Sequence, residues 1–201
     1  QNIYYSDKLT KKEARLRLDL EPDLFTLQLN LGGEGLGTTT LIKRLVKYEK
    51  PMQIVVLGGM DKKMLKKFEI LKKELPVNIK LHVRGFVSNV NEYLAASDIV
   101  VGRAGINTIV EAMYAHRPFL ITELVYTVLE SANYVEKYKV GWNCDLDVDK
   151  QEAVLKNLLQ NPTIIKEIDE RFGQIPIIYG PEKLVKILID DVTNYKAEKK
   201  I

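Results

Sequence analysis

The sequence predicts an α/β fold, a Rossmann-like doubly wound parallel sheet of about six strands. Short apolar runs recur along the chain, and each is followed by a segment whose apolar residues have helical spacing. The 201 residues suit one large α/β domain, and 46% of them are hydrophobic, enough for a sizeable core. Two of the apolar runs end in Gly-Gly, as a buried strand does before a tight turn.

The first strand is expected over Leu24–Leu31, and helical spacing follows from Leu36 to Tyr48. A second strand, Gln53–Leu57, precedes a helix through Met64–Leu75. The alternation continues with strands at Ile79–Val83, Ile99–Val101, Phe119–Ile121 and Val140–Cys144, and with helices near Val90–Ala96, Gly105–Ala115 and Ser131–Lys139. Mainly helical sequence completes the chain. Such alternation implies right-handed crossovers and a sheet covered on both faces.

Three segments are expected along the chain. Residues 1–22 predict a linker and a lead-in helix, because basic residues stand there among few large apolar ones. Residues 23–190 form the Rossmann-like domain, and 191–201 a polar helical tail. The chain starts with Gln1 instead of Met, which we interpret as a cut from a longer protein.

Composition and net charge limit the classes of function that this chain can have. The net charge of +3 is too small a surplus to require nucleic acid as a partner, and no apolar stretch approaches the roughly 20 residues that span a bilayer. The single cysteine, Cys144, excludes an internal disulfide framework, and its position favours a small residue at a strand end over a nucleophile. A reducing, cytoplasmic location fits this composition.

Two further residue patterns have ordinary structural explanations. Lysine pairs at 62/63, 66/67 and 72/73 surround the apolar stripe of one helix, which favours a solvated face over a membrane-surface helix. The lone His82 and His116 are more typical of packing or capping residues than of ligands or bases. No spacing of residues predicts a metal site.

Ligands of open parallel sheets bind at the carboxyl ends of the strands, so the loops after strands are the candidate sites. The first is glycine-rich, from Gly32 to Thr40, where the backbone can approach a phosphate and a helix N-terminus follows. A plain tight turn explains such a loop equally well, because it lacks the lysine of a P-loop.

The second loop, Arg103–Thr108, opens a helix that carries Glu111. Small and hydroxylated residues there can donate N–H and O–H groups to a diphosphate, and a carboxylate one turn later can accept from ribose hydroxyls. Capping by Asn107 or Thr108 with a solvated glutamate is the alternative. The third candidate is Glu130, near the start of the next helix, where it could bind sugar hydroxyls or cap that helix.

Taken in order, these pieces resemble the C-terminal domain of GT-B glycosyltransferases, in the group of the peptidoglycan N-acetylglucosaminyltransferase and the monogalactosyldiacylglycerol synthases. The resemblance extends over about residues 11–145. It is carried by Gly32-Gly33-Glu34-Gly35-Leu36-Gly37, Arg84-Gly85-Phe86-Val87, Ala96–Val101, Gly105 with Thr108 and Glu111, Arg117-Pro118, and Glu130 with Asn133. Leu129 departs from the pattern, since relatives often have glutamine there, and this leaves the sugar open.

The resemblance implies one half of a GT-B fold and a donor site. Thr108 and the glycine-rich loop would line the diphosphate, main chain near Phe86 would read the nucleobase, Glu111 would hold the ribose and Glu130 the donor sugar. The full set of expected donor-binding residues is Gly33, Glu34, Gly35, Phe86, Gly105, Asn107, Thr108, Glu111 and Glu130.

The resemblance also implies the chemistry of a hexosyltransferase. The reaction would be inverting and metal-independent, with a UDP-sugar as substrate, no cofactor, and N–H groups stabilising the leaving diphosphate. The base and the acceptor groove would lie in an N-terminal domain or partner subunit, so this chain by itself would be inactive. A lipid-linked acceptor and a peripheral contact at the cytoplasmic face of a membrane are implied by the same relatives. The alternatives are a non-catalytic donor-binding subunit recruited by a membrane partner and a nucleotide-sugar 2-epimerase domain.

Overall fold

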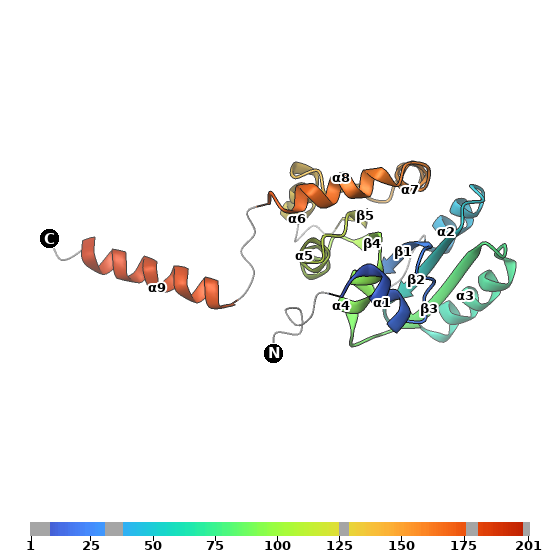
Figure 1. Cartoon of the computed structure of the whole chain (residues 1–201), viewed down its shortest axis with the longest axis horizontal. Coiled ribbons are helices and arrows are strands. Elements are labelled where there is room, and N and C mark those ends of the chain that lie inside the picture. Colours follow the sequence, from blue (N-terminus) through green and yellow to red (C-terminus); the bar gives the residue numbers. More distant parts are fainter. Residues whose placement is uncertain (1–8, 31–37, 125–128, 176–180, 199–201) are drawn as a thin grey trace.

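Six parallel strands form one sheet in the order β3-β2-β1-β4-β5-β6 (Figure 1). This computed structural model describes residues 9–30, 38–124, 129–175 and 181–198. The strands are β1 (Phe25–Asn30), β2 (Met52–Leu57), β3 (Ile79–Gly85), β4 (Ile99–Arg103), β5 (Phe119–Glu123) and β6 (Gly141–Asn143). The expected doubly wound sheet is therefore confirmed, and the order of its strands reverses direction between β1 and β4.

The register keeps apolar side chains of neighbouring strands level with each other. Leu27 on β1 pairs with Ile54 on β2 and with Ile99 on β4, and all three are buried. Strand β2 has no exposed position at all, as expected for a central parallel strand with helices over both faces.

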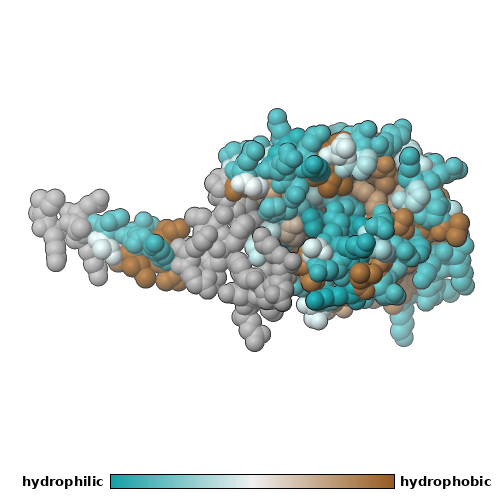
Figure 2. Space-filling model, in the orientation of Figure 1, coloured by the Kyte–Doolittle hydropathy of each residue, from teal (hydrophilic) through white to brown (hydrophobic). Residues whose placement is uncertain are grey.

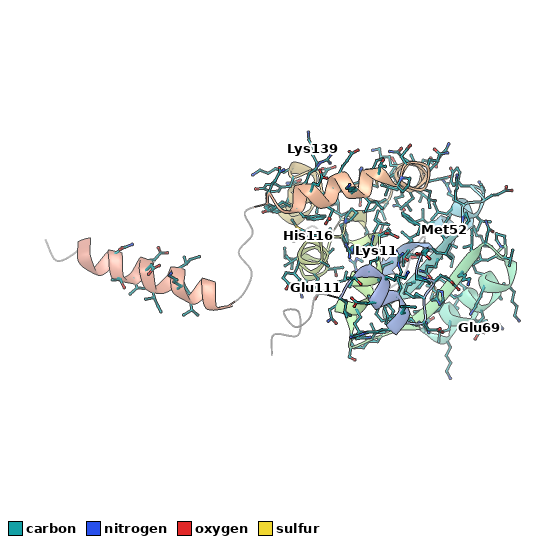
Figure 3. The ribbon with its side chains drawn as sticks, viewed as in Figure 1. Lys11, Met52, Glu69, Glu111, His116 and Lys139 are labelled. Atoms are coloured by element: carbon teal, nitrogen blue, oxygen red, sulfur yellow. The ribbon has the colours of Figure 1, made fainter. Side chains whose placement is uncertain are left out.

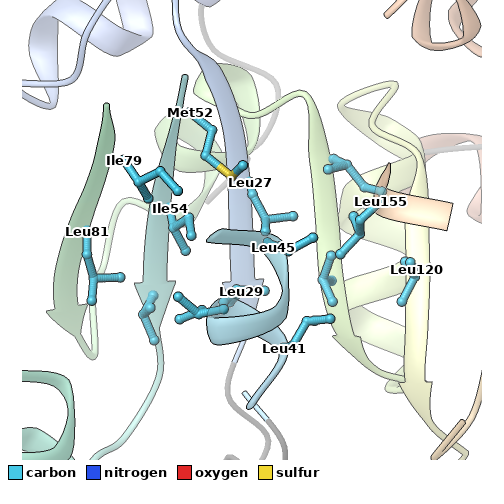
Figure 4. Close-up of a cluster of buried hydrophobic side chains, with 14 of the residues drawn as sticks. Leu27, Leu29, Leu41, Leu45, Met52, Ile54, Ile79, Leu81, Leu120 and Leu155 are labelled. Atoms are coloured by element: carbon cyan, nitrogen blue, oxygen red, sulfur yellow. The ribbon is translucent and has the colours of Figure 1, made fainter. Parts of the chain in front are cut away.

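Three helices cover one face of the sheet: α2 (Thr38–Val46), α3 (Lys62–Glu74) and α7 (Val148–Gln160). Leucines of α2 and α7 pack there against alternate residues of the strands (Figure 4). The spacing of Leu41, Ile42 and Leu45 puts all three on the same side of α2, which explains why this helix buries that side.

The opposite face carries α1 (Lys11–Arg17), α4 (Val90–Ala96), α5 (Ile106–Tyr114) and α6 (Leu129–Lys137). Helix α8 (Thr163–Phe172) adds Ile168 and Phe172 to the same core. The lead-in helix predicted within 1–22 is thus present as α1, and it begins with a capping box between Thr10 and Glu13.

Beneath α1 and α4 the sheet carries polar side chains. Thr26, Gln28 and Gln53 have no solvent exposure, and Gln53 donates a 2.8 Å hydrogen bond to the hydroxyl of Thr26. Because each buried polar group needs a partner, this stripe forms a connected network beside the apolar Val55 and Leu57 of β2, which pack against the same helices.

The last helix, α9 (Pro181–Glu198), runs across the boundary that we expected at residue 190. It lies apart from the sheet and its covering helices (Figure 1) and has hydrophobic residues along one side (Figure 2). Val185, Leu188 and Ile189 are exposed there at helical spacing and lie before the expected tail, whereas the part of α9 from residue 191 onward is mainly polar. Across the described ranges, none of the helices combines the length and the apolar character needed to cross a bilayer.

Candidate functional site

A cavity of about 130 Å³ opens where the strand order reverses, at the carboxyl ends of β1, β4 and β5. This is the place where open α/β sheets bind ligands, since the loops that follow adjacent strands separate there to opposite faces. The residues around it are Leu29, Asn30, Thr38, Leu41, Val101, Gly102, Thr122, Leu146, Val148 and Gln151.

Strands β1 and β4 approach closely at the floor of the cavity. A Cβ atom at Gly102 would lie 3.0 Å from the carbonyl oxygen of Asn30 and 3.2 Å from its Cβ atom. Gly102 also pairs with Asn30 in the parallel register. A glycine at this position therefore lets the two strand ends meet under the cavity.

The side chain of Asn30 is oriented by the buried polar network. Gln28 donates from Nε2 to Oδ1 of Asn30 at 2.8 Å, and Ser97 donates to Oε1 of Gln28 at 2.9 Å. Both Gln28 and Ser97 are buried. The network thus connects the cavity with the end of α4, where Ser97 stands as the C-cap.

The opposite wall depends on Gln151 of α7. Its amide donates to the carbonyl oxygen of Asp145 at 2.6 Å and to that of Thr122 at 3.4 Å. The carboxylate of Asp145 in turn accepts from the backbone N–H of Leu124 at 2.9 Å. These bonds fix the end of β5 against the start of α7.

A clasp holds the two helices that border the cavity. Arg44 of α2 bonds to Asp149 and, at 3.0 Å, to Glu152, while the hydroxyl of Tyr48 donates to Glu152 at 2.6 Å. The hydrogen bond from Tyr48, followed by Arg44, holds the pKa of Glu152 below its ordinary value. Because α2 and α7 are fixed to each other, the cavity between them keeps its shape.

Helix α5 begins on the other side of the strand reversal. Its N-cap is Gly105, which has no side chain to bond the first free N–H groups, and Asn107 is exposed while Thr108 is half-buried. N–H groups of a first helical turn have no partner within the helix. The starts of α2 and α5 therefore approach the carboxyl edge of the sheet from opposite faces.

The other described residues that were expected in the site do not line the cavity. Glu111 is half-buried on α5, and Glu130 is exposed in the first turn of α6. Phe86 follows β3 and is 90% exposed. Since neighbouring strands lie about 4.8 Å apart, β3 and β4 are separated by about 14 Å. Gly33, Glu34 and Gly35 lie outside the described residues.

An ion pair between β4 and β5 was not expected from the sequence. Nε of Arg103 lies 3.1 Å from a carboxylate oxygen of Glu123, and both side chains are partly exposed. The backbone N–H of Ala104 donates to the carbonyl oxygen of Glu123 at 2.9 Å. This pair fixes the strand ends from which the loop of Gly105 starts.

The cysteine and the two histidines do not line the cavity. Burial raises the pKa of the Cys144 thiol to about 11, so the side chain is protonated and serves in packing, as expected. Burial and the neighbouring Arg84 lower the pKa of His82, which stands within β3. His116 lies before β5, at the opposite edge of the sheet, and stacks on Phe172 with ring centroids 5.3 Å apart. Within the ranges that the structure describes, no three His, Cys, Asp or Glu side chains gather as metal ligands would.

Sequence reasoning missed Asn30, Thr122 and Gln151. Asn30 and Thr122 stand at the carboxyl ends of strands, where parallel sheets bind ligands. Their position and polar side chains could therefore have identified them as candidate site residues. Gln151 carries no local signal, because it reaches the cavity from a helix more than one hundred residues after β1.

A profile of the family described as "Glycosyltransferase family 28 C-terminal domain" matches residues 39–175. Two curated relatives are the probable monogalactosyldiacylglycerol synthase 2 of Oryza sativa subsp. japonica and the monogalactosyldiacylglycerol synthase 2 of Arabidopsis thaliana. Each is 30% identical over 125 residues, which are 58% of this chain and 26% of the relative. The chain thus spans about a quarter of their length.

Solved structures share the fold. Alr3699/HepE of Anabaena, in complex with UDP, has a TM-score of 0.65 at 14% identity, covering 85% of this chain and 48% of that protein. The UDP-GlcNAc 2-epimerase of Neisseria meningitidis, bound to UDP-GlcNAc, has a TM-score of 0.64 at 15% identity, covering 92% of this chain and 48% of that enzyme. At such low identity these similarities show the fold.

Proposed function

This chain belongs to the glycosyltransferase family 28 C-terminal domains, and from that premise we propose that it binds the nucleotide-sugar donor of a two-domain glycosyltransferase. The observation that carries the proposal is the cavity at the strand reversal, bordered by α2, by α7 and by β4, the strand that precedes α5. The first N–H groups of a helix have no partner within it, and the positive ends of two helix dipoles favour a diphosphate between them.

We propose that the parts of the donor bind in one order along the carboxyl edge of the sheet. The nucleobase lies against main chain near Phe86, the ribose bonds to Glu111, and the diphosphate takes N–H and O–H groups from Gly105 to Thr108. Gly33, Glu34 and Gly35 complete the phosphate site, and Glu130 binds the sugar. The separation of about 14 Å between β3 and β4 suits a nucleoside diphosphate extended along the edge.

We propose an inverting transfer in which an acceptor hydroxyl attacks the anomeric carbon while UDP leaves. N–H donors at the start of α5 would stabilise the charge on the leaving diphosphate without a metal ion, which is the logic of an oxyanion hole applied to phosphate. The base and the acceptor groove belong to a further domain or subunit. The acceptor is lipid-linked, in keeping with the lipid products for which the curated relatives are named.

Titration calorimetry with UDP, in the presence and absence of EDTA, tests the donor site. We expect weak binding that EDTA leaves unchanged, and a loss of about 1–3 kcal/mol of binding free energy in Glu111→Ala. Glu170→Ala, an exposed carboxylate of α8, is the matched control and keeps wild-type affinity. Binding that disappears with EDTA contradicts the metal-free site, and unchanged affinity in a folded Glu111→Ala variant contradicts the role of Glu111.

The half-enzyme proposal has its own test. Catalysis requires donor and acceptor to be held within reacting distance, which can contribute about 7–11 kcal/mol of the barrier. We expect no transfer from labelled UDP-sugars to lipid acceptors by the 201-residue chain, and transfer once the acceptor domain or subunit is supplied. Turnover by the chain alone would overturn the proposal. Inactivity of every full-length form that binds UDP would favour a non-catalytic subunit.

The alternative function is that of a nucleotide-sugar 2-epimerase, because a UDP-GlcNAc 2-epimerase has a similar fold. It needs acid and base groups beside the sugar. His82 stands inside β3, and His116 lies at the edge opposite to the cavity, so neither supplies such a group.

A further inference from the structure

None of the described residues that line the cavity at the strand reversal has a charged side chain. Threonine, asparagine and glutamine stand there beside leucine and valine, and the N–H groups proposed for the diphosphate belong to helix starts. Neutral amides and hydroxyls are suited to neutral hydroxyl groups of a ligand. The cavity of about 130 Å³ is much larger than the roughly 10–15 Å³ that one water molecule requires, so it has room for part of a larger ligand.

Gln151 of α7 presents a hydrogen-bond acceptor at the wall of this cavity. Its side chain is buried, and Nε2 donates to the carbonyl oxygens of Asp145 and Thr122. Carbonyl oxygens only accept hydrogen bonds, so the amide cannot be turned around, and Oε1 points away from both of them. No residue in the described ranges donates to Oε1. An acceptor that is fixed in direction and left without a partner from these residues is expected to bind a donor group of a ligand.

Further polar groups of the cavity supply donors. Oδ1 of Asn30 accepts from Gln28, which leaves the N–H groups of its Nδ2 for a ligand. The hydroxyls of Thr38 and Thr122 can donate or accept, and neither bonds to another residue of the described ranges. Each hydroxyl of a sugar both donates and accepts, so a mixture of donors and acceptors around apolar walls suits a sugar ring.

The cavity lies away from the residue proposed to hold the ribose. Helix α7 packs on the same face of the sheet as α2 and α3, whereas Glu111 belongs to α5 on the opposite face. Figure 3 shows Glu111 far from α7. In a nucleotide sugar the diphosphate stands between the ribose and the sugar, so the two ends of the donor reach different parts of the site. The space beside Gln151 is therefore available to the sugar end.

We infer that the cavity binds the hexose of the donor and that Gln151 determines which hexose is accepted. Oε1 of Gln151 accepts from one sugar hydroxyl, and Nδ2 of Asn30 donates to another oxygen of the sugar. A hexose without the matching hydroxyl leaves Oε1 without a donor and binds more weakly. The inference rests on the proposed donor function, and it adds α7 to the sugar contact proposed for Glu130.

Titration calorimetry tests the inference on the 201-residue chain, with UDP, UDP-glucose, UDP-galactose, UDP-N-acetylglucosamine and the monodeoxy analogues of these sugars. We expect one UDP-hexose to bind about tenfold more tightly than UDP, and one of its deoxy forms to lose most of that advantage. Gln151→Met should bind the complete and the deoxy sugar alike. A merely structural role of Gln151 would weaken UDP and both sugars by the same factor and preserve their ratio.

Two further variants complete the test. Thr122→Val removes a cavity hydroxyl but keeps the carbonyl oxygen to which Gln151 donates, and it should reduce the advantage of the UDP-hexose over UDP. Gln160→Met makes the matched change at an exposed position at the other end of α7, and it should keep wild-type discrimination. Circular dichroism confirms the fold of each variant. If Gln151→Met does not fold, Thr122→Val decides, and an unchanged advantage of the hexose there overturns the inference.

Failure of this inference differs from failure of the donor function. If the wild type does not bind UDP, both are overturned. Three results overturn the inference alone: UDP binding without any gain from a hexose, equal binding of the complete and every deoxy sugar by the wild type, and unchanged discrimination in a folded Gln151→Met variant.

Discussion

The guanidinium of Arg15 and the carboxylate of Asp98 form a buried ion pair, with 2.7 Å between Nη2 and Oδ2. The same oxygen accepts from the backbone N–H of Thr26 at 2.7 Å, and the other oxygen lies 2.5 Å from Nζ of Lys11. The pair fixes α1 to the sheet just before β4. Arg15 also donates to the carbonyl oxygen of Ala96, so it satisfies the end of α4.

Asp98→Asn should lower the free energy of unfolding by about 3–5 kcal/mol, because a buried charge on Arg15 loses its partner. Urea denaturation measures the change. Asp149→Asn, in an ion pair whose carboxylate is largely exposed, should cost no more than about 1 kcal/mol. Equal losses in the two variants would contradict the importance of burial.

Gly141→Ala should destabilise the junction of β5, β6 and α6. A Cβ atom at this position would lie 2.0 Å from the carbonyl oxygen of Phe119 and 2.5 Å from Cγ1 of Val135. We expect a loss of about 3 kcal/mol or more from overpacking, measured as a lower urea midpoint. Gly59→Ala is the control, since no atom lies within 4 Å of its added Cβ, and a comparable loss there would argue against the steric explanation.

The clasp between α2 and α7 should make stability depend on acid pH. The pKa of Glu152 is lowered in the folded chain, first by the bond from Tyr48 and then by Arg44, so its contribution is complete above the unfolded value of about 4.3. That contribution is lost as the pH falls through the folded pKa.

Thermal unfolding at a series of pH values from about 7 to about 3 measures this effect. Glu152→Gln should be less stable than the wild type at neutral pH, and the difference should shrink at acid pH. Tyr48→Phe should also lower the stability at neutral pH, through the lost hydrogen bond to Glu152. A wild type and a Glu152→Gln variant that lose stability in parallel would show that other carboxylates determine the acid response.

Cys144 should react slowly with iodoacetamide in the folded chain. Burial raises the pKa of its thiol to about 11, so little thiolate is present near neutral pH. Mass spectrometry should show fast labelling in urea and slow labelling in buffer, with the rate still rising above about pH 9. Rapid labelling of the folded chain at neutral pH would contradict this prediction.

The alternation of strands and helices was readable from the sequence because each element carries its own periodicity. The strand at Gln53–Leu57 and the helix at Val90–Ala96 were expected within one residue of their observed bounds. Apolar residues recur at every second position in a half-buried strand and at every third to fourth position in a helix. This spacing shows which side of the element is buried, and it can be read from a short stretch of sequence. The ends of strands were predicted less accurately. Strand β4 extends to Arg103 and β5 to Glu123, two residues further than expected, because these residues pair with each other across the two strands.

The layered α/β architecture and the glycosyltransferase family follow from the amino-acid sequence, because periodicity and the ordered motifs from Gly32 to Glu130 lie along the chain. Only the tertiary structure brought Asn30, Thr122 and Gln151 together around one cavity, and paired Arg15 with Asp98. Those partners are separated by tens of residues or more, and their contacts depend on strand order and register. No local sequence pattern specifies which polar residues meet across a sheet. The residues that line the cavity are therefore set by tertiary packing.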